Sequence, residues 1–557
     1  MKTKRSGISI MAFYLAAALL IALALAASLR PSVAGPTGGP AAHTGSQATG
    51  QTGDSALSES KPYGVEVIWP SAMGEIDSLK DVKSIPSYNS LNPKERDENT
   101  RLPKVAIGPQ IIEPDLAVQL KAIGPDMPNP IANFDGLSLA DQIATFSPPD
   151  TNGDIGYDPT TGKRYYFQWI NITYKVWDVT NPALPVVVVP TTQGNALWQA
   201  ALPGSECALD NDGDPIALFD EQAQRWFISQ FAISTQFHQC VAVSKTANPA
   251  GGWYVYDYTY RDGTTYFNDY PHFGVWPDPV YNAYFMTMHQ FNAAGTAWLG
   301  QSASAFDRAR LLNGVAAPLV LFDLFSVNAN FSGMLAADLD GSRPPAGTPG
   351  FFFEVDDGAF IPPADALRIW EFKPDWTTPA SSTFGLNGQA NYTLTVTSFT
   401  LISCAGNPNC IPQSGTTTQL DTLGDRLMHR VAFRVQSGIT QSVVLNHTVD
   451  AGSGRAGVRW YEVQRNPATG IWTINQQSTY ALADTLHRWM GSVAMDRAGD
   501  IALGYSASGT TAVPSIRYAG RLSTDPLSTL PQSEVTMTVS TGPQTGSSRW
   551  GDYSMLG

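Results

Sequence analysis

The sequence predicts an all-β protein whose main domain is a β-propeller of six or seven four-stranded blades. Three observations lead to this prediction. The chain contains 49 Gly and 40 Pro residues, a composition typical of many short strands joined by turns. Long stretches with helical periodicity are scarce. A short motif, in which a turn leads into a strand of small and apolar residues, recurs at a nearly constant interval.

The recurring motif is clearest at 487–506. There, a strand, a tight turn at 496–500 and a second strand predict a β-hairpin. Equivalent points along the chain are Asp154, Asp214, His272, Met334, Asp425, Met490 and Gly551. The intervals between them are 60, 58, 62, 91, 65 and 61 residues. A period of about 60 residues accommodates four strands with long loops. The long interval contains 404–410, which predicts an inserted loop there.

Residues 1–34 have the pattern of a signal peptide or of an uncleaved membrane anchor. Basic residues within 2–5 precede an apolar run over 11–27, and Ser-Val-Ala at 32–34 is a candidate cleavage site. The apolar run is close to the shortest length that spans a bilayer, about 17 residues. We therefore expect an exported protein, either extracellular, cell-surface or periplasmic, that meets the membrane only through this segment.

Two further segments precede the repeats. Residues 35–61 are rich in Gly, Ser, Thr and Ala, which predicts a flexible linker. Residues 62–149 contain short apolar pieces between prolines and charges, which predicts an irregular, partly ordered lead-in. The propeller itself is predicted over 150–557. Because its last equivalent point falls so late, we expect a last blade that is incomplete or is closed by N-terminal residues, or a six-bladed ring with an extra strand.

Charge and cysteine content narrow the range of functions. The formal net charge of −14 argues against a nucleic-acid surface, because phosphate binding requires clustered Lys and Arg. Four cysteines in an exported chain allow three pairings. We expect Cys207–Cys240 and Cys404–Cys410, since each pair lies within one proposed blade or loop. The lack of a Cys-x-x-Cys motif favours structural disulfides over a metal or redox site.

Two turns place oxygen-bearing side chains at alternate positions, as calcium-binding loops do. These side chains are Asp150, Asn152 and Asp154 in the first turn, and Asp210, Asp212 and Asp214 in the second. Neither turn completes an EF-hand, and both lead directly into apparent strands. Calcium is therefore the one cofactor that the sequence suggests. Tight acidic turns at blade entrances are the alternative interpretation.

Arginines occupy corresponding starts of three consecutive repeats. Such starts converge around the axis of a propeller, so three guanidinium groups could face one ligand. The ligand-binding candidates on this axial face are Arg426, Arg488, Arg549, Asp552 and Asp214. The alternative interpretation is that these arginines form ion pairs between blades, with Asp425, Asp552 or other acids.

Five motifs carry a resemblance to a known family. They lie at 147–154 (Ser-Pro-Pro-Asp-Thr-Asn-Gly-Asp), 213–215, 420–428, 487–492 and 549–554. Through them, roughly over 145–557, the chain resembles a family of exported bacterial proteins that are usually left uncharacterised. The resemblance implies a secreted, propeller-like module, without a particular reaction. It also implies a further strand after the last motif, which this chain lacks.

The arginine pattern resembles, in residue type only, the cluster with which sialidases hold an acidic sugar. However, the sequence lacks their repeat signature, Ser-x-Asp-x-Gly-x-x-Trp. Carboxylates for glycosidase chemistry are available at Asp154, Asp214, Asp269 and Asp552. Tyr270 and Tyr553 are candidate nucleophiles in such a scheme, although aromatic packing also accounts for them. His272, His429 and His487 could meet near the axis.

The sequence thus predicts an exported propeller that binds an extracellular carbohydrate or protein on its axial face. The alternative function is a propeller-type, sialidase-like glycoside hydrolase that uses axial carboxylates and the arginine cluster. A scaffold that only displays loops is a third possibility. The sequence lacks the nucleophile elbow and the phosphate loop, which disfavours serine hydrolases and nucleotide enzymes. No catalytic residue is assigned.

Overall fold

The structure is a computed structural model that describes residues 64–82, 115–122, 124–142, 148–402, 408–436 and 440–557. The predicted signal or anchor segment and the predicted linker therefore lie outside the described residues, as does Cys404. Within the described residues, no helix has the length and apolar character needed to cross a membrane. The described chain is dominated by β-strands, as predicted, and only short helices accompany them.

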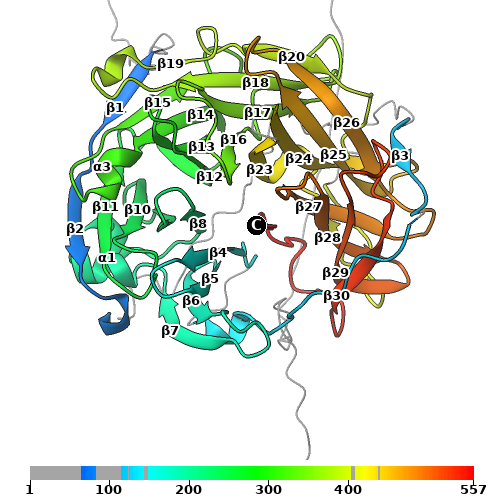
Figure 1. Ribbon diagram of the computed structural model, residues 1–557, viewed down its shortest axis with the longest axis horizontal. Helices are drawn as coiled ribbons and strands as arrows, with labels where there is room; N and C mark the ends of the chain where they lie inside the picture. The colour runs from blue at the N-terminus through cyan, green and yellow to red at the C-terminus, as the bar shows by residue number, and fades with distance from the viewer. Residues whose placement is uncertain (1–63, 83–114, 123, 143–147, 403–407, 437–439) are drawn as a thin grey trace, which may run out of the picture.

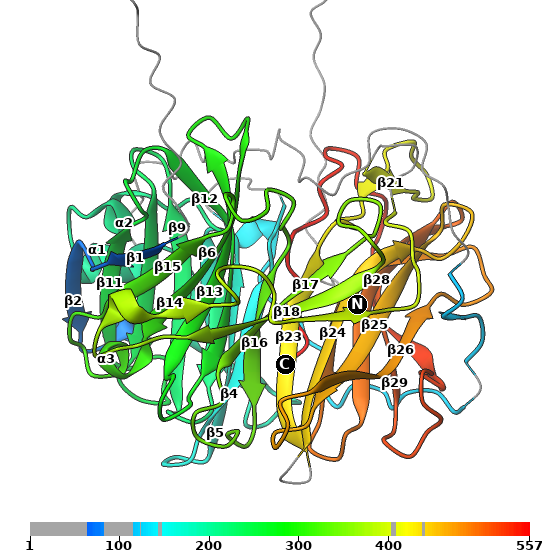
Figure 2. The same ribbon diagram turned by 90° about the horizontal axis from the view of Figure 1, so that it is seen from above.

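Strands are arranged around a central axis like the blades of a propeller (Figure 1), and Figure 2 shows the blades standing side by side. The first blade contains β4 (Asn152–Asp158), β5 (Lys163–Ile170), β6 (Thr173–Asp178) and β7 (Val186–Gln193). The second contains β8 (Ile216–Asp220), β9 (Arg225–Ala232), β10 (His238–Ser244) and β11 (Trp253–Thr259). The third contains β12 (Tyr266–Trp276), β13 (Ala283–Asn292), β14 (Trp298–Asp307) and β15 (Leu319–Asp323).

A ten-stranded sheet continues the ring. One half contains β16 (Leu335–Asp340), β17 (Gly350–Asp356), β18 (Ala366–Lys373), β19 (Thr383–Phe384) and β20 (Tyr392–Thr395). The other half contains β23 (Leu427–Gln436), β24 (Thr440–Asp450), β25 (Ala456–Arg465) and β26 (Trp472–Tyr480). The innermost strands β16 and β23 pair in parallel and join the two halves. A further blade follows, with β27 (His487–Met495), β28 (Ile501–Gly509), β29 (Ala512–Arg521) and β30 (Gln532–Val539).

The arrangement is therefore propeller-like, with four separate blades and one curled ten-stranded sheet. The predicted count of six or seven blades is not confirmed, because the parallel pairing of β16 with β23 merges two groups of strands into one sheet. A small two-stranded sheet of β21 (Asn409–Ile411) and β22 (Leu420–Asp421) lies in the long interval of the repeat. The short helices are α1 (Ala196–Ala201), α2 (Glu206–Leu209), α3 (Arg308–Leu312), η1 (Leu79–Asp81), η2 (Leu139–Asp141) and η3 (Pro379–Ser381).

The predicted hairpin at 487–506 is present as β27 and β28, which pair antiparallel. Its turn is stabilised by Asp496, whose Oδ1 accepts hydrogen bonds from the backbone N–H groups of Ala498 and Asp500. Gly499 has a φ of 87°, which glycine adopts without steric cost. The Asp-Arg-Ala-Gly-Asp sequence thus determines the turn locally, which explains why it could be recognised in the sequence.

The segment 62–149, expected to be an irregular lead-in, contributes three strands to the outside of the ring. They are β1 (Val65–Ile68), which pairs with β15, β2 (Ala72–Ile76), which pairs with β11, and β3 (Val118–Gln119), which pairs with β26. Beyond β3, the chain runs along β30, where Met127 N–H donates to the carbonyl of Ser533. Farther on, Phe134 packs against Tyr166 and Trp177 of the first blade. This segment therefore connects the last blade to the first (Figure 1).

Adjacent blades are held together by apolar clusters between their faces. One cluster joins the first blade to the second through residues such as Phe167 and Trp226. Another joins the second to the third through Phe227 and Tyr284, and a larger one extends from the third blade into the ten-stranded sheet. Because each blade buries its faces only against its neighbours, stability is shared around the ring.

The structure contains the predicted disulfide between Cys207 and Cys240, whose Cα atoms are 5.7 Å apart. It joins α2 to β10 in the second blade. The second predicted pair includes Cys404, outside the described residues, so that pairing stays a prediction.

Removing the first disulfide is expected to destabilise the protein. The bridge closes a loop with a sequence separation of 33, and a loop of that size corresponds to about 3–4 kcal/mol of lost unfolded-state entropy. We expect the double variant C207A/C240A to have a free energy of unfolding that is lower by about this amount, measured by chemical denaturation. A loss below about 1 kcal/mol would show that the bridge contributes little to stability.

Candidate functional site

Side-chain oxygens on the innermost strands accept hydrogen bonds from the backbone of neighbouring innermost strands. Such strands are sheet edges, and their unpaired N–H groups need acceptors. Asn152 Oδ1 accepts from Ala217 N–H at 2.7 Å, which links β4 to β8. Asp338 Oδ1 accepts from Val275 N–H at 2.8 Å, which links β16 to β12. These bonds fix polar side chains at the centre of the ring.

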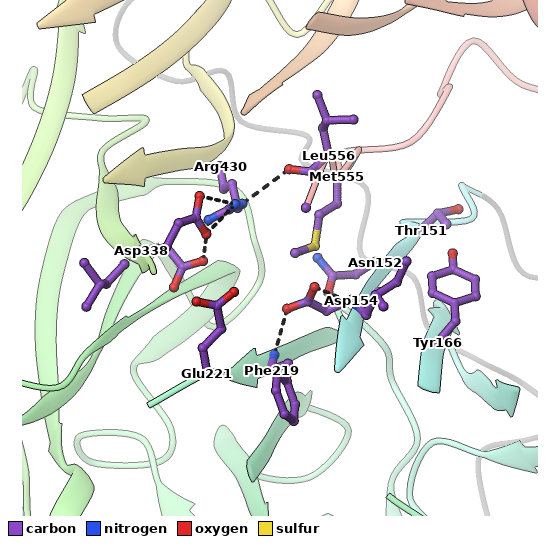
Figure 3. A pocket seen from close by; sticks show the side chains of 15 residues that line it. Thr151, Asn152, Asp154, Tyr166, Phe219, Glu221, Asp338, Arg430, Met555 and Leu556 are labelled. Atoms are coloured by element: carbon purple, nitrogen blue, oxygen red, sulfur yellow. Dashed lines mark hydrogen bonds and ion pairs between the residues drawn. The ribbon is translucent and has the colours of Figure 1, made fainter. Parts of the chain in front are cut away.

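A cavity of about 340 Å³ lies among these strands (Figure 3). Its walls come from the start of β4, the end of β8, the end of β16, the innermost strand β23 and the segment 555–557. Carboxyl groups line it at Asp154, Glu221, Asp338 and Asp340, and the one basic side chain of the lining is Arg430. Tyr166 and Phe219 also belong to the lining, and the Phe219 ring points away from the cavity toward Trp226.

Arg430 is bound by two carboxylates in the cavity wall. Its Nη1 lies 2.8 Å from Asp338 Oδ2, and its Nη2 donates to both carboxylate oxygens of Asp340 at 2.8 Å. Burial raises the pKa of Asp338 to about 6, and the charge of Asp340 also raises it, whereas Arg430 lowers it. The guanidinium is thus used to hold two acids together, and little of it is available for a ligand.

Asp154 lies opposite this ion-paired group (Figure 3). Its two oxygens accept backbone hydrogen bonds from Ile155 N–H at 2.7 Å and from Phe219 N–H at 2.8 Å. It forms no ion pair with any residue that the structure describes. Burial raises the pKa of Asp154 to about 7, although these hydrogen bonds and the charge of Arg430 act in the opposite direction. The carboxyl group therefore exchanges its proton near neutral pH.

Two further polar groups belong to the lining. The Nδ2 of Asn152 is buried at the cavity wall and has no hydrogen-bond partner among the described residues, and Figure 3 shows Asn152 beside Asp154. Glu221 is exposed at the cavity, where its Oε2 accepts one hydrogen bond from Gly341 N–H at 2.7 Å. The cavity thus presents one amide donor and several carboxyl acceptors to a ligand.

The segment 549–554 brings five of the sequence-predicted residues together at the starts of the innermost strands. Arg549 Nη2 lies 2.6 Å from Asp552 Oδ2, and Asp150 Oδ1 accepts from Asp552 N–H at 2.9 Å. Asp214 Oδ2 accepts from the hydroxyl of Tyr553 at 2.7 Å. These acids and this arginine therefore have structural partners, and their contact with a ligand stays a prediction.

The other two predicted arginines are also paired. Arg426 Nε lies 2.9 Å from Asp425 Oδ1, and its guanidinium lies 4.7 Å from the ring centre of Tyr270. Arg488 is fully buried and pairs with Asp484 at 2.7 Å and with Glu534 at 3.1 Å. Glu534 lies on β30 of the same blade as Arg488, so this arginine stabilises its own blade.

The predicted aromatic and histidine candidates are packed at the centre of the ring. The rings of Tyr270 and Tyr553 stack at 5.5 Å, and those of His272 and His429 stack at 4.9 Å. Burial lowers the pKa of His429 to about 3 and moves that of His272 in the same direction. Both histidines are therefore neutral over the physiological range. His487 is placed elsewhere, where its Nδ1 accepts from Ala456 N–H at 3.2 Å.

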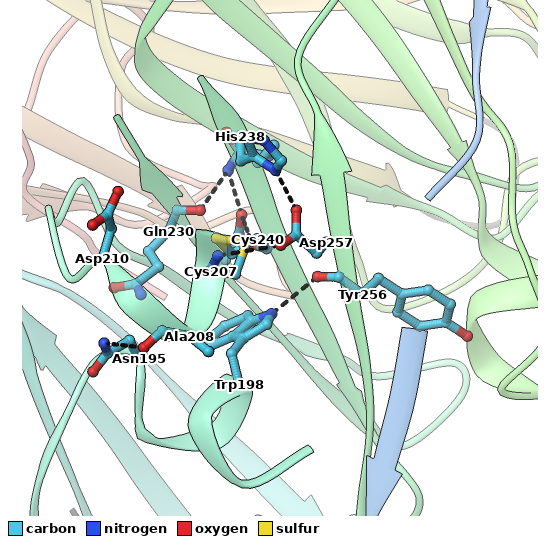
Figure 4. Close-up of a disulfide and its surroundings, with 12 residues drawn as sticks. Asn195, Trp198, Cys207, Ala208, Asp210, Gln230, His238, Cys240, Tyr256 and Asp257 are labelled. Atoms are coloured by element: carbon cyan, nitrogen blue, oxygen red, sulfur yellow. Dashed lines mark hydrogen bonds and ion pairs between the residues drawn. A yellow bond between two sulfur atoms is a disulfide. The ribbon is translucent and has the colours of Figure 1, made fainter. Parts of the chain in front are cut away.

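The second acidic turn connects the start of β8 to the loop after β9. Asp212 Oδ2 accepts from Ile233 N–H at 2.7 Å, and Asp210 Oδ2 accepts from Ser234 N–H at 3.2 Å. Figure 4 shows Asp210 near the disulfide and His238. Burial raises the pKa of Asp210 to about 7, with a further contribution from Asp212. Among the described residues, no group of three or more His, Cys, Asp or Glu is arranged to hold a metal ion. Calcium binding at either turn stays a prediction.

Sequence reasoning missed most of the cavity. Glu221, Asp338, Asp340 and Arg430 were not among the candidates, although Asn152 and Asp154 were. Asp338 and Asp340 are two positions apart on β16 and hence on the same face of the strand. That alternation was a usable signal within a recognised repeat. The ion pair with Arg430 could not be predicted from the sequence, because it depends on how β16 pairs with a strand some 90 residues away.

Comparisons with known proteins add only a distant likeness of shape. No protein-family model matches the chain, and no curated protein matches its sequence. Among solved structures, an alpha-L-arabinanase of Penicillium chrysogenum complexed with arabinobiose is 9% identical, over 66% of this chain and 91% of that one, with a TM-score of 0.29. An exo-1,5-alpha-L-arabinanase from a bovine ruminal metagenomic library is 12% identical, over 59% of this chain and 96% of that one, with a TM-score of 0.25.

A polysaccharide lyase, the PL25 ulvan lyase, is 10% identical over 70% of this chain and 96% of that one, with a TM-score of 0.26. At such TM-scores, the likeness carries no argument about ligand or reaction. The fold and the site therefore define the protein only by class, as an all-β, propeller-like protein with an acidic cavity on its axis.

Replacing Arg430 is expected to be strongly destabilising, because Asp338 and Asp340 would stay buried without their partner. For the variant R430M, which keeps a side chain of some bulk, we expect a loss of about 3–5 kcal/mol in the free energy of unfolding. R434M is the matched control, because Arg434 lies farther from Asp340, at 3.7 Å, and is partly exposed. Equal losses in the two variants, measured by chemical denaturation, would contradict this assignment.

Asp154 is expected to make stability depend on pH. Its pKa of about 7 in the folded state exceeds the ordinary value of 3.8, so the folded state holds the proton more tightly. The free energy of unfolding should then fall as the pH rises from about 4 to about 7. The variant D154N should lack this pH dependence. The change in the free energy of unfolding between pH 4 and pH 7 should therefore differ between the variant and the unmodified protein by roughly 1–2 kcal/mol, a figure reduced because water in the cavity screens the charge. Parallel stability curves for D154N and the unmodified protein over this range would rule out the raised pKa.

Proposed function

We propose that this protein is an exported β-propeller that binds a carbohydrate in its axial cavity. The observation that carries the proposal is the lining of the cavity, where several carboxyl acceptors and one amide donor without a described partner border the same space. Sugar hydroxyl groups both donate and accept hydrogen bonds, so they complement such a mixed lining. Tyr166, a half-buried residue of the lining, offers apolar surface for the C–H face of a sugar.

The size of the cavity favours a sugar over a protein ligand. Small-molecule sites typically have volumes of about 300–1,000 Å³, and the axial cavity, at about 340 Å³, lies at the lower end of this range. A specific protein partner would instead need an interface of roughly 800 Å² on this chain. The Cys207–Cys240 disulfide supports export, since such bonds persist in oxidising compartments.

We also propose that the ring is a six-bladed propeller. On this interpretation, the strands β16–β20 form one blade and β23–β26 form the next, fused by the parallel pair of β16 and β23. Each half has the antiparallel order of a separate blade. The segment 549–557 then follows the axis past the innermost strands, where Leu556 N–H donates to Ser492 Oγ at 2.9 Å.

Glycoside hydrolysis is the second candidate function, and one specific observation favours it. With a pKa of about 7, the carboxyl group of Asp154 is well suited to donate a proton to a leaving oxygen. Glycosidases need such an acid together with a second, ionised carboxylate, for which Asp338 and Glu221, also in the lining, are candidates. The arginine-dependent, sialidase-like form is less favoured, because Arg426, Arg488 and Arg549 each pair with an acid.

A panel of soluble oligosaccharides tests both candidates in one experiment. Binding is measured by calorimetry, and the same mixtures are analysed by chromatography for shorter products. We expect at least one oligosaccharide to bind, and the variant D154N to weaken binding about tenfold, which corresponds to the loss of one charge-assisted hydrogen bond. The matched control is D135N, which removes a carboxylate that is exposed outside the cavity.

The outcomes separate the two functions. Binding without shorter products supports a binding protein, whereas products that disappear in D154N but persist in D135N support hydrolysis. Binding that D154N and D135N affect equally would contradict the assignment of the axial cavity as the ligand site.

A further inference from the structure

The lining of the cavity is strongly acidic, and its one basic side chain, Arg430, is already ion-paired. Arg430 binds Asp338 and Asp340 together, so its positive charge is balanced within the wall. Glu221 has no such counter-ion among the described residues, and neither has Asp154, which is about half ionised at pH 7; both line the same cavity. Carboxylates that lack a cation attract a cationic group and repel an anionic one. The field in the cavity therefore favours a ligand with a positive charge.

A second, independent feature is the amide of Asn152. This side chain is 1% exposed, and its Oδ1 is occupied by Ala217 N–H. That bond fixes the orientation of the amide and leaves Nδ2 buried at the cavity wall without a described partner. A buried donor without a partner destabilises the protein. A ligand oxygen at this position would remove that cost.

From these two features, we propose that the cavity selects amino sugars, in which a protonated amine and a hydroxyl group occupy neighbouring ring positions. The amine would lie against Asp154 and Glu221, and the hydroxyl oxygen would accept from Asn152 Nδ2. This inference rests on the proposed carbohydrate function and adds the class of sugar. Both functional groups are needed. A protonated amine alone offers no acceptor to Asn152 Nδ2, and a neutral hydroxyl group alone does not balance the charge of the cavity carboxylates.

Other ligand chemistries fit the same features less well. A uronic acid or a sulfated sugar would place its negative charge beside Asp154 and Glu221 without a free cation to offset it. An N-acetylated amino sugar offers an oxygen to Asn152, but its amide nitrogen carries no charge. A metal ion would need a group of ligands, and the described residues contain no group of three or more His, Cys, Asp or Glu side chains placed to hold one.

Three matched oligosaccharides of equal length and linkage test the proposal. They are β-1,4-linked tetramers of glucosamine, of N-acetylglucosamine and of glucose, compared by calorimetry with the full chain at pH 7. We expect the glucosamine tetramer to bind at least about tenfold more tightly than the other two, because one charge-assisted contact separates them. Equal affinity for the three tetramers would overturn the amino-sugar inference but leave the carbohydrate function intact. Failure of every oligosaccharide to bind would overturn the function itself.

The variant E221Q locates the selectivity in the cavity. Glu221 is exposed and accepts only one described hydrogen bond, so the variant should fold, as its melting temperature would confirm. We expect E221Q to weaken binding of the glucosamine tetramer about tenfold and to leave binding of the glucose tetramer within twofold of its original value. D135N, which removes an exposed carboxylate outside the cavity, should change neither affinity. An unchanged affinity of E221Q for the glucosamine tetramer would contradict the proposal.

Discussion

The structure depends on hydrogen bonds that run from the side chains of one innermost strand to the backbone of the next. Except for β16 and β23, which pair with each other, an innermost strand is the edge of its sheet, and its unpaired N–H groups lose contact with water once the ring closes. Asn152 and Asp154 of β4 supply the acceptors for β8, and Asp338 of β16 supplies one for β12. These bonds set the register between blades and at the same time place acids at the axis. The acidic character of the cavity is therefore a consequence of how the ring is held together.

The same constraint explains why the sequence repeats. Residues with positive φ occur just before two innermost strands, at Asp150 (40°) and Asp214 (47°), and at irregularities within two others, at Tyr270 (54°) and Met490 (48°). Among residues with a Cβ, Asp tolerates this conformation better than most. Asp150 and Asp214 therefore suit their positions for a backbone reason. The hydrogen bonds of Asp150 and Asp214 to the segment 549–554 add a second structural role to the acids that the sequence suggested as calcium ligands.

Local features were predictable from sequence and long-range ones were not. The hairpin at 487–506 and the Cys207–Cys240 disulfide follow from residues close in the chain, and both are present. The pairing of β16 with β23, which left the blade count unconfirmed, depends on strands far apart. The site shows the same division. Asp154 belongs to a turn motif that is recognisable in the sequence. Its role, however, depends on Arg430, Glu221 and the Asn152 Nδ2 that lacks a described partner, and these groups meet only when the ring is closed.

The proposed ligand site is the axial cavity, and not the face that carries Arg426 and Arg549. A crystal structure of the protein soaked with an oligosaccharide that binds in solution distinguishes the two sites. We expect a sugar ring in the cavity, with one hydroxyl group within hydrogen-bond distance of Asn152 Nδ2 and a second polar group against Glu221. A sugar bound beside Arg426 and Arg549, with the cavity unoccupied, would show that the cavity is not the ligand site.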